Sequence, residues 1–183
     1  MYAGHFAVGL ALKAKEPRAP TWGILTGVGL LDLLFGPLVL AGVERASVTP
    51  AISPGFTLDY IDWSHSAAMA VFWSLLFGLL FLRFGSRVAG VMTLAAFSHF
   101  LLDLPMHPPD LALWPGSPIH LGFGLWQTLP VGWWVIELGL IAVAGGYYLR
   151  RSKASEEFGG RPYAVLAVLL ALHLSNSPWL SPL

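Results

Sequence analysis

Long runs of hydrophobic residues with few charges between them dominate the 183-residue chain. A helical span takes about 20 apolar residues, and four runs reach that scale: 20–43, 61–82, 88–104 and 129–149. Two shorter runs, 2–12 and 163–180, fit short tilted spans or re-entrant or interfacial segments. Their uninterrupted apolar character is typical of helices, since the strands of a membrane barrel alternate polar and apolar positions. The pattern predicts an all-α, polytopic transmembrane bundle of five or six spans with two long outer loops.

Composition supports this prediction. The chain carries 10 basic and 10 acidic residues, or 11% charged residues, whereas 56% of its residues are hydrophobic. A soluble domain usually carries about 25% charged residues. So little charge excludes a disordered chain and a nucleic-acid binder that works through basic charge, and the absence of cysteine excludes a disulfide-stapled fold. We expect a single integral membrane domain over residues 1–183, with the lipid bilayer as partner, no nucleic acid, and an oligomeric state that stays open.

The basic residues predict the orientation, because loops rich in lysine and arginine stay in the cytoplasm. With six crossings, nine of the ten basic residues share one side: Lys13, Lys15, Arg18, Arg83, Arg87, Arg150, Arg151, Lys153 and Arg161. Arg45 alone falls on the other side. Both termini and the loops 44–60 and 105–128 are then expected to face outward. If the first segment does not cross, only the N-terminus changes side.

A carboxylate or imidazole inside an apolar run is costly and therefore a functional-site hypothesis, and five such residues are the main candidates. They are His5, Asp32, His65, His99 and Asp103. At about 1.5 Å per residue from the cytoplasmic ends, Asp32 lies about 18 Å up its helix and His99 about 21 Å. Asp103 and His65 lie at about 27 and 30 Å, and His5 nearer 12 Å. The set is expected in the outer half of the bilayer.

A pair on one helix carries the clearest metal-binding signal. His99 and Asp103 are four residues apart, so both point to one helix face. An imidazole nitrogen suits zinc, copper, iron or nickel, a carboxylate oxygen adds manganese, and soft thiolate sites are excluded without cysteine. We expect Pro105 to end this helix, which leaves His107 either to fold back over the site or to point away. Pro37 is expected to kink the second span beside Asp32.

Each of these residues also has a structural interpretation. Asp32 fits a residue that hydrogen-bonds a neighbouring helix, Asp103 fits an interfacial acid at a helix end, and His65 fits a snorkelling side chain at a span entrance. Asp62 and Asp110 fit solvated loop acids, and His107 and His120 fit surface histidines. Glu137 would pair with a polar group elsewhere, and His173 would be structural. The convergence of the five intramembrane residues on one side of the bilayer favours a shared site.

Several motifs occur in an order that resembles a known family. They are Gly4-His5, the Asp32 span, Ser64-His65-Ser66, and Ser98-His99-Phe100-Leu101-Leu102-Asp103 followed by Leu113-Trp114-Pro115. Over roughly residues 4–115 the chain resembles the bacterial membrane-bound metal-dependent hydrolases of the YdjM-like family. The resemblance implies that His5, Asp32, His65, His99 and Asp103 belong to a metal site. The chain departs from the family's pattern in two places. Only Asp32 remains where many members have an Asp-x-Asp-His cluster, and the His-Arg pair that members tend to carry before the Ser-His-Ser motif is missing. Both departures weaken the case for two metals and for an arginine that binds phosphate.

The leading hypothesis is a metal-dependent hydrolase of the bacterial inner membrane, with its site facing the periplasmic side. It would act on a lipid or lipid-linked ester or phosphoester near the outer leaflet. A divalent ion, zinc first and manganese second, would be held by the five residues above, and His107 or Asp62 would shuttle protons. One alternative is a protein that binds or transports metal ions or protons. Another is a non-catalytic membrane scaffold.

Overall fold

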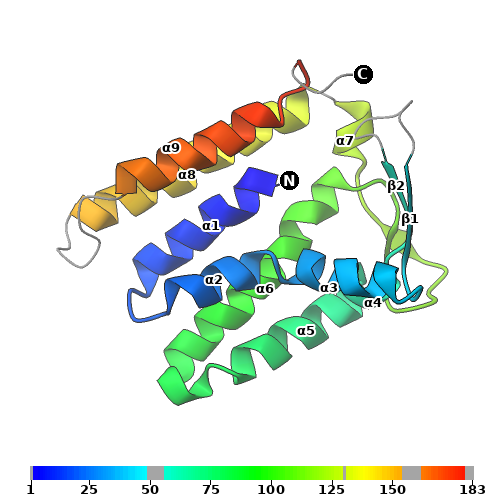
Figure 1. The fold of residues 1–183 in the computed structure, drawn as a ribbon, viewed down its shortest axis with the longest axis horizontal. Coiled ribbons are helices and arrows are strands. Elements are labelled where there is room, and N and C mark those ends of the chain that lie inside the picture. Colours follow the sequence, from blue (N-terminus) through cyan, green and yellow to red (C-terminus); the bar gives the residue numbers. More distant parts are fainter. Residues whose placement is uncertain (1, 49–55, 130, 154–161, 180–183) are drawn as a thin grey trace.

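Helices form most of the computed structural model, which describes residues 2–48, 56–129, 131–153 and 162–179 (Figure 1). The longer helices are α1 (Tyr2–Lys15), α2 (Thr21–Val28), α3 (Leu30–Leu40), α5 (Ala67–Leu79), α6 (Ser86–Met106), α8 (Gly132–Lys153) and α9 (Pro162–Ser175). Two single turns, α4 (Asp62–His65) and α7 (Leu125–Thr128), and a 3-10 turn, η1 (Leu82–Phe84), complete the helical elements of the described part.

Two helices of the described part, α6 and α8, are long and apolar enough to cross a membrane, and α2 with α3 makes a third if the bent pair is one span. The apolar helices α5 and α9 are shorter, with 13 and 14 residues. The expected run 61–82 is divided because the backbone of Ser66 is extended (φ −69°, ψ 154°) and separates α4 from α5. The helical, membrane-like character is confirmed, and the count of five or six spans stays a prediction.

Small residues allow the helices to approach closely. A side chain at Gly78 of α5 would meet Thr93 and the Ala89 carbonyl of α6, and Gly9 of α1 lies against Val28 of α2. Such contacts are typical of helix pairs in membranes, where close van der Waals packing replaces the hydrophobic drive. In Figure 1, α1 lies between the α8–α9 pair and the α2–α6 layer, and α1 contacts helices on both sides.

Two expectations about proline are wrong in detail. The sharp bend of the second run, 58°, falls between α2 and α3 at Gly29, whereas Pro37 lies within α3. Glycine is the weakest ordinary helix former, so the helix breaks there at low cost. Pro105 does not end α6, which continues to Met106. A proline so near the C-terminus removes a single hydrogen bond, and the His107 N–H still bonds the Asp103 carbonyl at 2.9 Å.

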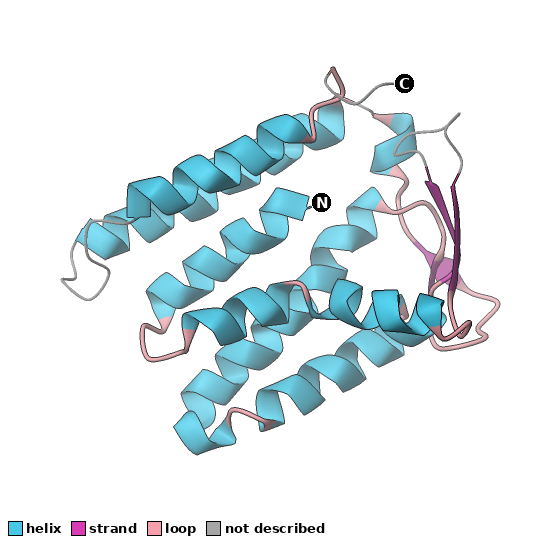
Figure 2. Cartoon of the chain, viewed as in Figure 1, coloured by secondary structure: helices cyan, strands magenta, loops and turns pink. Residues whose placement is uncertain are grey.

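The two long loops contain small antiparallel sheets that the all-α prediction lacked (Figure 2). Strand β1 (Arg45–Val48) pairs with β2 (Phe56–Tyr60), and β3 (Leu111–Ala112) pairs with β4 (His120–Leu121). Gly122 and Gly124, both with positive φ, carry the chain past the end of α6, where the Gly124 N–H bonds the His107 carbonyl at 2.7 Å. These sheets and α7 gather at one end of the bundle.

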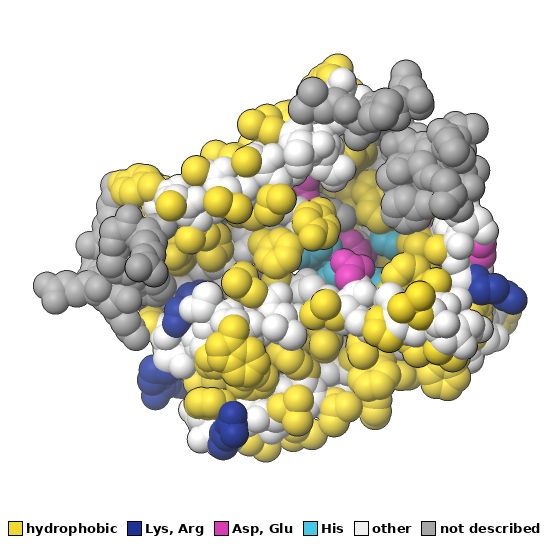
Figure 3. Space-filling view, viewed as in Figure 1, with side chains coloured by type: hydrophobic (Ala, Val, Ile, Leu, Met, Phe, Trp, Pro, Cys, Tyr) yellow, Lys and Arg dark blue, Asp and Glu magenta, His cyan; other side chains and the backbone are white. Residues whose placement is uncertain are grey.

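Apolar side chains cover much of the visible surface between the two ends (Figure 3). Leu33, Leu75 and Val143, for example, are each more than half exposed. Visible lysine and arginine side chains collect mainly at the end opposite the sheets, with one group beside the sheets. Extended exposed apolar surface of this kind marks a contact with lipid or with another protein.

Candidate metal centre

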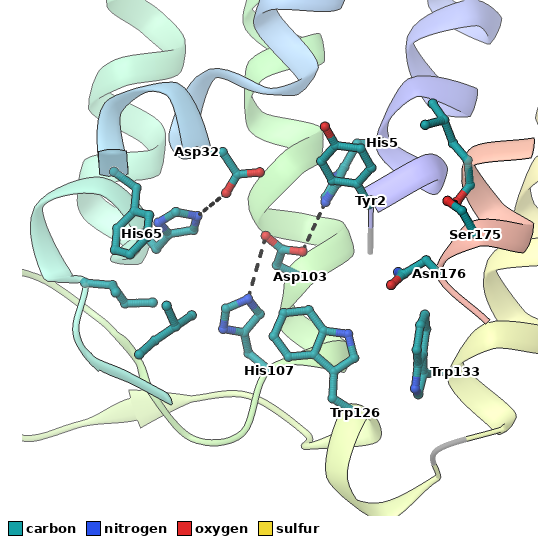
Figure 4. A pocket seen from close by; sticks show the side chains of 14 residues that line it. Tyr2, His5, Asp32, His65, Asp103, His107, Trp126, Trp133, Ser175 and Asn176 are labelled. Carbon is teal, nitrogen blue, oxygen red and sulfur yellow. Dashed lines mark hydrogen bonds and ion pairs between the residues drawn. The ribbon is translucent and has the colours of Figure 1, made fainter. Parts of the chain in front are cut away.

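Four helices direct polar side chains into one cavity of ≈460 Å³ (Figure 4). His5 comes from α1, Asp32 from α3, His65 from α4 and Asp103 from α6. His99, one turn before Asp103 on α6, lies behind them and is 1% exposed. The structure thus brings together all five intramembrane residues singled out from the sequence.

The first group of potential ligands is His5, His99 and Asp103, three buried residues with one ligand atom each within 4.8 Å of the others. Asp103 uses both oxygens: Oδ1 lies 3.1 Å from His5 Nε2, and Oδ2 lies 3.0 Å from His99 Nε2. The two imidazole rings stack, with centroids 4.1 Å apart and planes 3° from parallel. The carboxylate therefore spans the nitrogen edges of a stacked imidazole pair.

The second group is Asp32, His65 and His99, and it shares His99 with the first. Asp32 Oδ1 lies 3.5 Å from His65 Nε2 and 3.6 Å from His99 Nε2. Two ligand atoms each about 2.1 Å from a tetrahedral ion lie about 3.4 Å apart. The two distances from Asp32 match this spacing, as they would if the three residues shared one zinc-like ion.

Hydrogen bonds fix which imidazole nitrogen faces the cavity. His99 Nδ1 donates to the Val28 carbonyl at 2.7 Å, and that carbonyl is available because α2 ends at Val28 and the chain bends. His99 Nε2 is therefore left as the potential ligand atom. Ligand histidines in metal sites usually donate their other N–H in this way. The bend at Gly29 thus has a direct consequence for the site.

A buried acid, Glu44, orients His65 through a serine. The Ser64 hydroxyl donates to the Glu44 carboxylate, with oxygens at 2.8 and 3.0 Å, so it accepts from His65 Nδ1 at 2.6 Å. The Ser64 N–H also donates to Glu44, at 2.7 Å. Glu44 is 1% exposed, although it follows an apolar run and stands beside Arg45, which makes it look like a loop acid in the sequence. The sequence prediction missed it.

His107 lies in the site because α6 continues through Pro105. His99 and Asp103 lie four residues apart on one face of α6, and His107, four residues further on, directly follows the last residue of the helix. His107 Nε2 lies 3.9 Å from Asp103 Oδ2, and His107 Nδ1 pairs with Asp110 Oδ1 at 3.0 Å. The surface interpretation of His107, which is 3% exposed, is therefore wrong, whereas Asp110 is a partly exposed loop acid that pairs with it. Trp126 covers the imidazole, with ring centroids 4.4 Å apart.

The charge balance favours a divalent cation. Asp32 and Asp103 are the charged residues among the described cavity-lining side chains, none of which is lysine or arginine. With neutral histidines the two carboxylates carry a formal charge of −2, and Asp103, which is 3% exposed, is buried where charge is costly unless it is compensated. His99 Nε2 is buried without a hydrogen bond, although Asp103 Oδ2 is 3.0 Å away. The residues present therefore fit a divalent metal ion, whose identity the ligand set does not fix.

Two other candidates lie outside the cluster. Asp62 is 4% exposed, so the solvated interpretation is wrong, but its carboxylate accepts from the Gly116 N–H at 2.8 Å and does not line the described cavity. It anchors the 105–128 loop, and its expected role as a proton shuttle gains no support. His120 is exposed at the end of β4, in agreement with its surface interpretation.

A second buried pair, Glu137 and His173, contacts the segment of α1 that carries His5. Glu137 on α8 and His173 on α9 are both 0% exposed, and His173 Nδ1 lies 2.8 Å from Glu137 Oε2. Glu137 Oε1 accepts from the Gly4 N–H at 2.9 Å, in the first turn of α1. A carboxylate is favourable at a helix N-terminus, where N–H groups lack partners within the helix. The expected polar partner of Glu137 is thus the segment that carries His5.

Comparisons with known proteins do not assign the chain to a family. No protein-family model, curated protein or solved structure matches the chain. The resemblance to the membrane-bound metal-dependent hydrolases therefore stays a prediction that rests on the motif residues themselves.

Proposed function

We propose that this protein is a membrane-embedded, metal-dependent hydrolase. The observation that carries the proposal is the buried cluster in which His99 belongs to two groups of three potential ligands, with His65 and His99 each held by a hydrogen bond on the nitrogen remote from the cavity. Imidazoles fixed in this way around two carboxylates are what a metal centre requires. Asp32, His65, His99 and Asp103 would hold the ion, with His5 as a further ligand.

The ion would supply Lewis-acid chemistry, by acidifying water and polarising the ester or phosphoryl oxygen under attack. The chain's own acid–base group would be His107. Its Nδ1 pairs with Asp110, which orients the ring and leaves Nε2 toward Asp103 and the cavity. Nε2 would take a proton from the attacking water and pass it to the leaving oxygen. A base within reach of the site and oriented by a carboxylate is a recurrent catalytic arrangement.

The cavity walls indicate the class of substrate. Phe35, Leu58, Ile61, Trp126 and Trp133 supply most of the apolar lining, and no lysine or arginine lies among the described lining residues. A soluble polyanion would find no counter-charge there apart from the ion. We therefore propose a lipid or lipid-linked ester or phosphoester. The location of the protein in a bacterial inner membrane, with the site toward the periplasm, is part of this proposal.

Packing below the cluster favours hydrolysis over transport. A transporter needs a polar path that continues across the bilayer. On the opposite side of His99 from the loops, Leu12, Val28 and Ala95 form a buried apolar cluster, and a second cluster around Met92 lies next to it. The site ends against this packed apolar core, an arrangement that suits chemistry on a substrate admitted from one side.

Turnover by the purified, zinc- or manganese-loaded protein tests the proposal. A panel of phospholipids, lysolipids and polyprenyl phosphates would be presented in mixed micelles, with products identified by mass spectrometry. We expect release of a hydrolysis product that is lost in Asp32→Asn and His107→Ala and kept in His120→Ala, an exposed histidine outside the cavity. Metal binding without turnover on the whole panel would favour a scaffold, and metal flux into proteoliposomes without hydrolysis would favour transport.

A further inference from the structure

A second cavity opens onto the same carboxylate from another direction. Its volume is ≈380 Å³, and it shares Tyr2, His5 and Asp32 with the site cavity. It lies between α1 and the bent α2–α3 pair. The two cavities therefore meet at the cluster, and Figure 3 shows carboxylate and imidazole atoms within a hollow between hydrophobic surfaces.

The walls of this second cavity, which we call the α1/α3 groove, are mostly hydrocarbon apart from Tyr2, His5 and Asp32, which it shares with the site cavity. Phe6 of α1 faces Leu25 and Val28 of α2 and Leu33 of α3, and Thr26 and Gly29 complete the wall. Leu33 is 58% exposed and Leu25 is 37% exposed. No lysine or arginine is among the described residues that line the groove.

The bend at Gly29 explains why the groove exists. α1 packs on α2, and beyond the 58° bend α3 diverges from the line of α1, as Figure 1 shows. Asp32, in the first turn of α3, has a side chain that is 54% exposed, whereas its partners His65 and His99 are 5% and 1% exposed. Its carboxylate is thus the member of the cluster that a molecule in the groove reaches first.

We propose that the α1/α3 groove holds a hydrocarbon chain of a bilayer lipid. This inference rests on the proposed function and names the substrate class: a lipid whose scissile ester or phosphoester lies at the base of the chain. The chain would lie against Phe6, Leu25 and Leu33, the bond to be cleaved against Asp32, and the headgroup in the larger cavity. An apolar groove without cationic residues, which runs from an exposed apolar surface to a half-exposed carboxylate, suits a neutral chain and offers no counter-charge to a soluble anion.

The molecule contains a matched control groove. A cavity of ≈390 Å³ between α5 and α6 is also apolar, with Val71, Leu75 and Leu94 in its walls, but no ionisable residue lines it. Leu75 there is 54% exposed, close to the 58% of Leu33. The two grooves differ mainly in their connection to the His–Asp cluster.

Photo-crosslinking in nanodiscs tests the proposal. The probe is a phosphatidylglycerol with a diazirine in its acyl chain, and adducts are mapped by mass spectrometry on the full, metal-loaded protein. We expect adducts at Phe6, Leu25 and Leu33 to exceed those in the α5/α6 groove severalfold. Leu33→Trp should remove most of this excess and Leu75→Trp should not, with unfolding temperature and metal content measured for both. Equal labelling of the two grooves, or labelling that Leu33→Trp leaves intact, would overturn the proposal.

The readout does not depend on turnover, so the two proposals fail separately. Localised crosslinking with no hydrolysis on any lipid would keep the groove as a lipid site and refute the hydrolase. Hydrolysis of a lipid with uniform crosslinking would keep the hydrolase and refute the groove.

Discussion

The two serines that flank His65 allow a sharp test of how the site is built, because they have different partners. The Ser64 hydroxyl accepts from His65 Nδ1 and donates to the buried Glu44. The Ser66 hydroxyl accepts from the Met69 N–H at 3.4 Å and caps α5. Replacing either serine by alanine removes one hydroxyl group, at positions only two residues apart.

The expected magnitudes follow from these contacts. Losing the group that orients a ligand histidine typically costs about 10–100-fold in metal affinity, or about 1.4–2.7 kcal/mol. Ser64→Ala should fall in this range, because it leaves His65 free to turn and deprives Glu44 of a donor. Loss of an N-cap costs about 0.5–2 kcal/mol of stability. The long cap contact of Ser66 places Ser66→Ala near the low end of that range, with metal affinity unchanged.

The assay is competitive titration of the metal-free protein in detergent with zinc and a chromophoric chelator, together with thermal unfolding of the metal-free form. We expect Ser64→Ala to weaken binding and Ser66→Ala to lower only the unfolding temperature. If both variants changed affinity equally, or if Ser64→Ala bound as tightly as the unchanged protein, the assignment of His65 as an oriented ligand would be refuted.

Three further predictions concern the surroundings of the site. Glu137→Gln leaves one of two buried donors unpaired, at a cost of about 1–3 kcal/mol of stability, and should weaken metal binding about tenfold; in a His5→Ala background that loss of affinity should vanish, and an undiminished loss would show that Glu137 does not act through His5. Asp110→Asn should lower kcat about 100-fold or more with metal content unchanged, because His107 loses the carboxylate that orients it; a changed metal content would contradict this. Gly78→Ala should destabilise the protein by about 1–3 kcal/mol through overpacking of α5 on α6, and unaltered thermal unfolding would contradict the close helix contact.

The sequence predicted which residues gather in the candidate site better than it predicted the framework that holds them. His99 and Asp103 could be paired from their spacing alone, since four residues make one turn of any helix. Asp32 and His65 were expected only in the same, outer half of the bilayer, and both lie in the cluster. Local rules failed where long-range contacts decide. Glu44 is buried because the chain folds back over Ser64, 20 residues away. The hydropathy pattern does not indicate that contact.

The same limit applies to the helix boundaries. The prolines predicted a kink at Pro37 and a helix end at Pro105, but the chain bends at Gly29 and α6 continues past Pro105. A single missing N–H near a helix end costs little beside the contacts that His107 gains. The pairing of Glu137 on α8 with His173 on α9 joins residues 36 apart in the sequence, so only their three-dimensional arrangement reveals it. The number of membrane crossings stays a prediction for a related reason, because helix length and apolar content do not by themselves place a helix in a bilayer.

The metal content of the purified protein tests the central claim most directly. Inductively coupled plasma mass spectrometry on protein prepared without added chelator would give the ions bound per chain, for the unchanged protein, for His99→Ala and for the exposed-histidine control His120→Ala. We predict at least one zinc or manganese ion per chain, lost in His99→Ala and retained in His120→Ala. A metal-free protein that also fails to take up either ion on reconstitution, or a content unaffected by His99→Ala, would contradict the account.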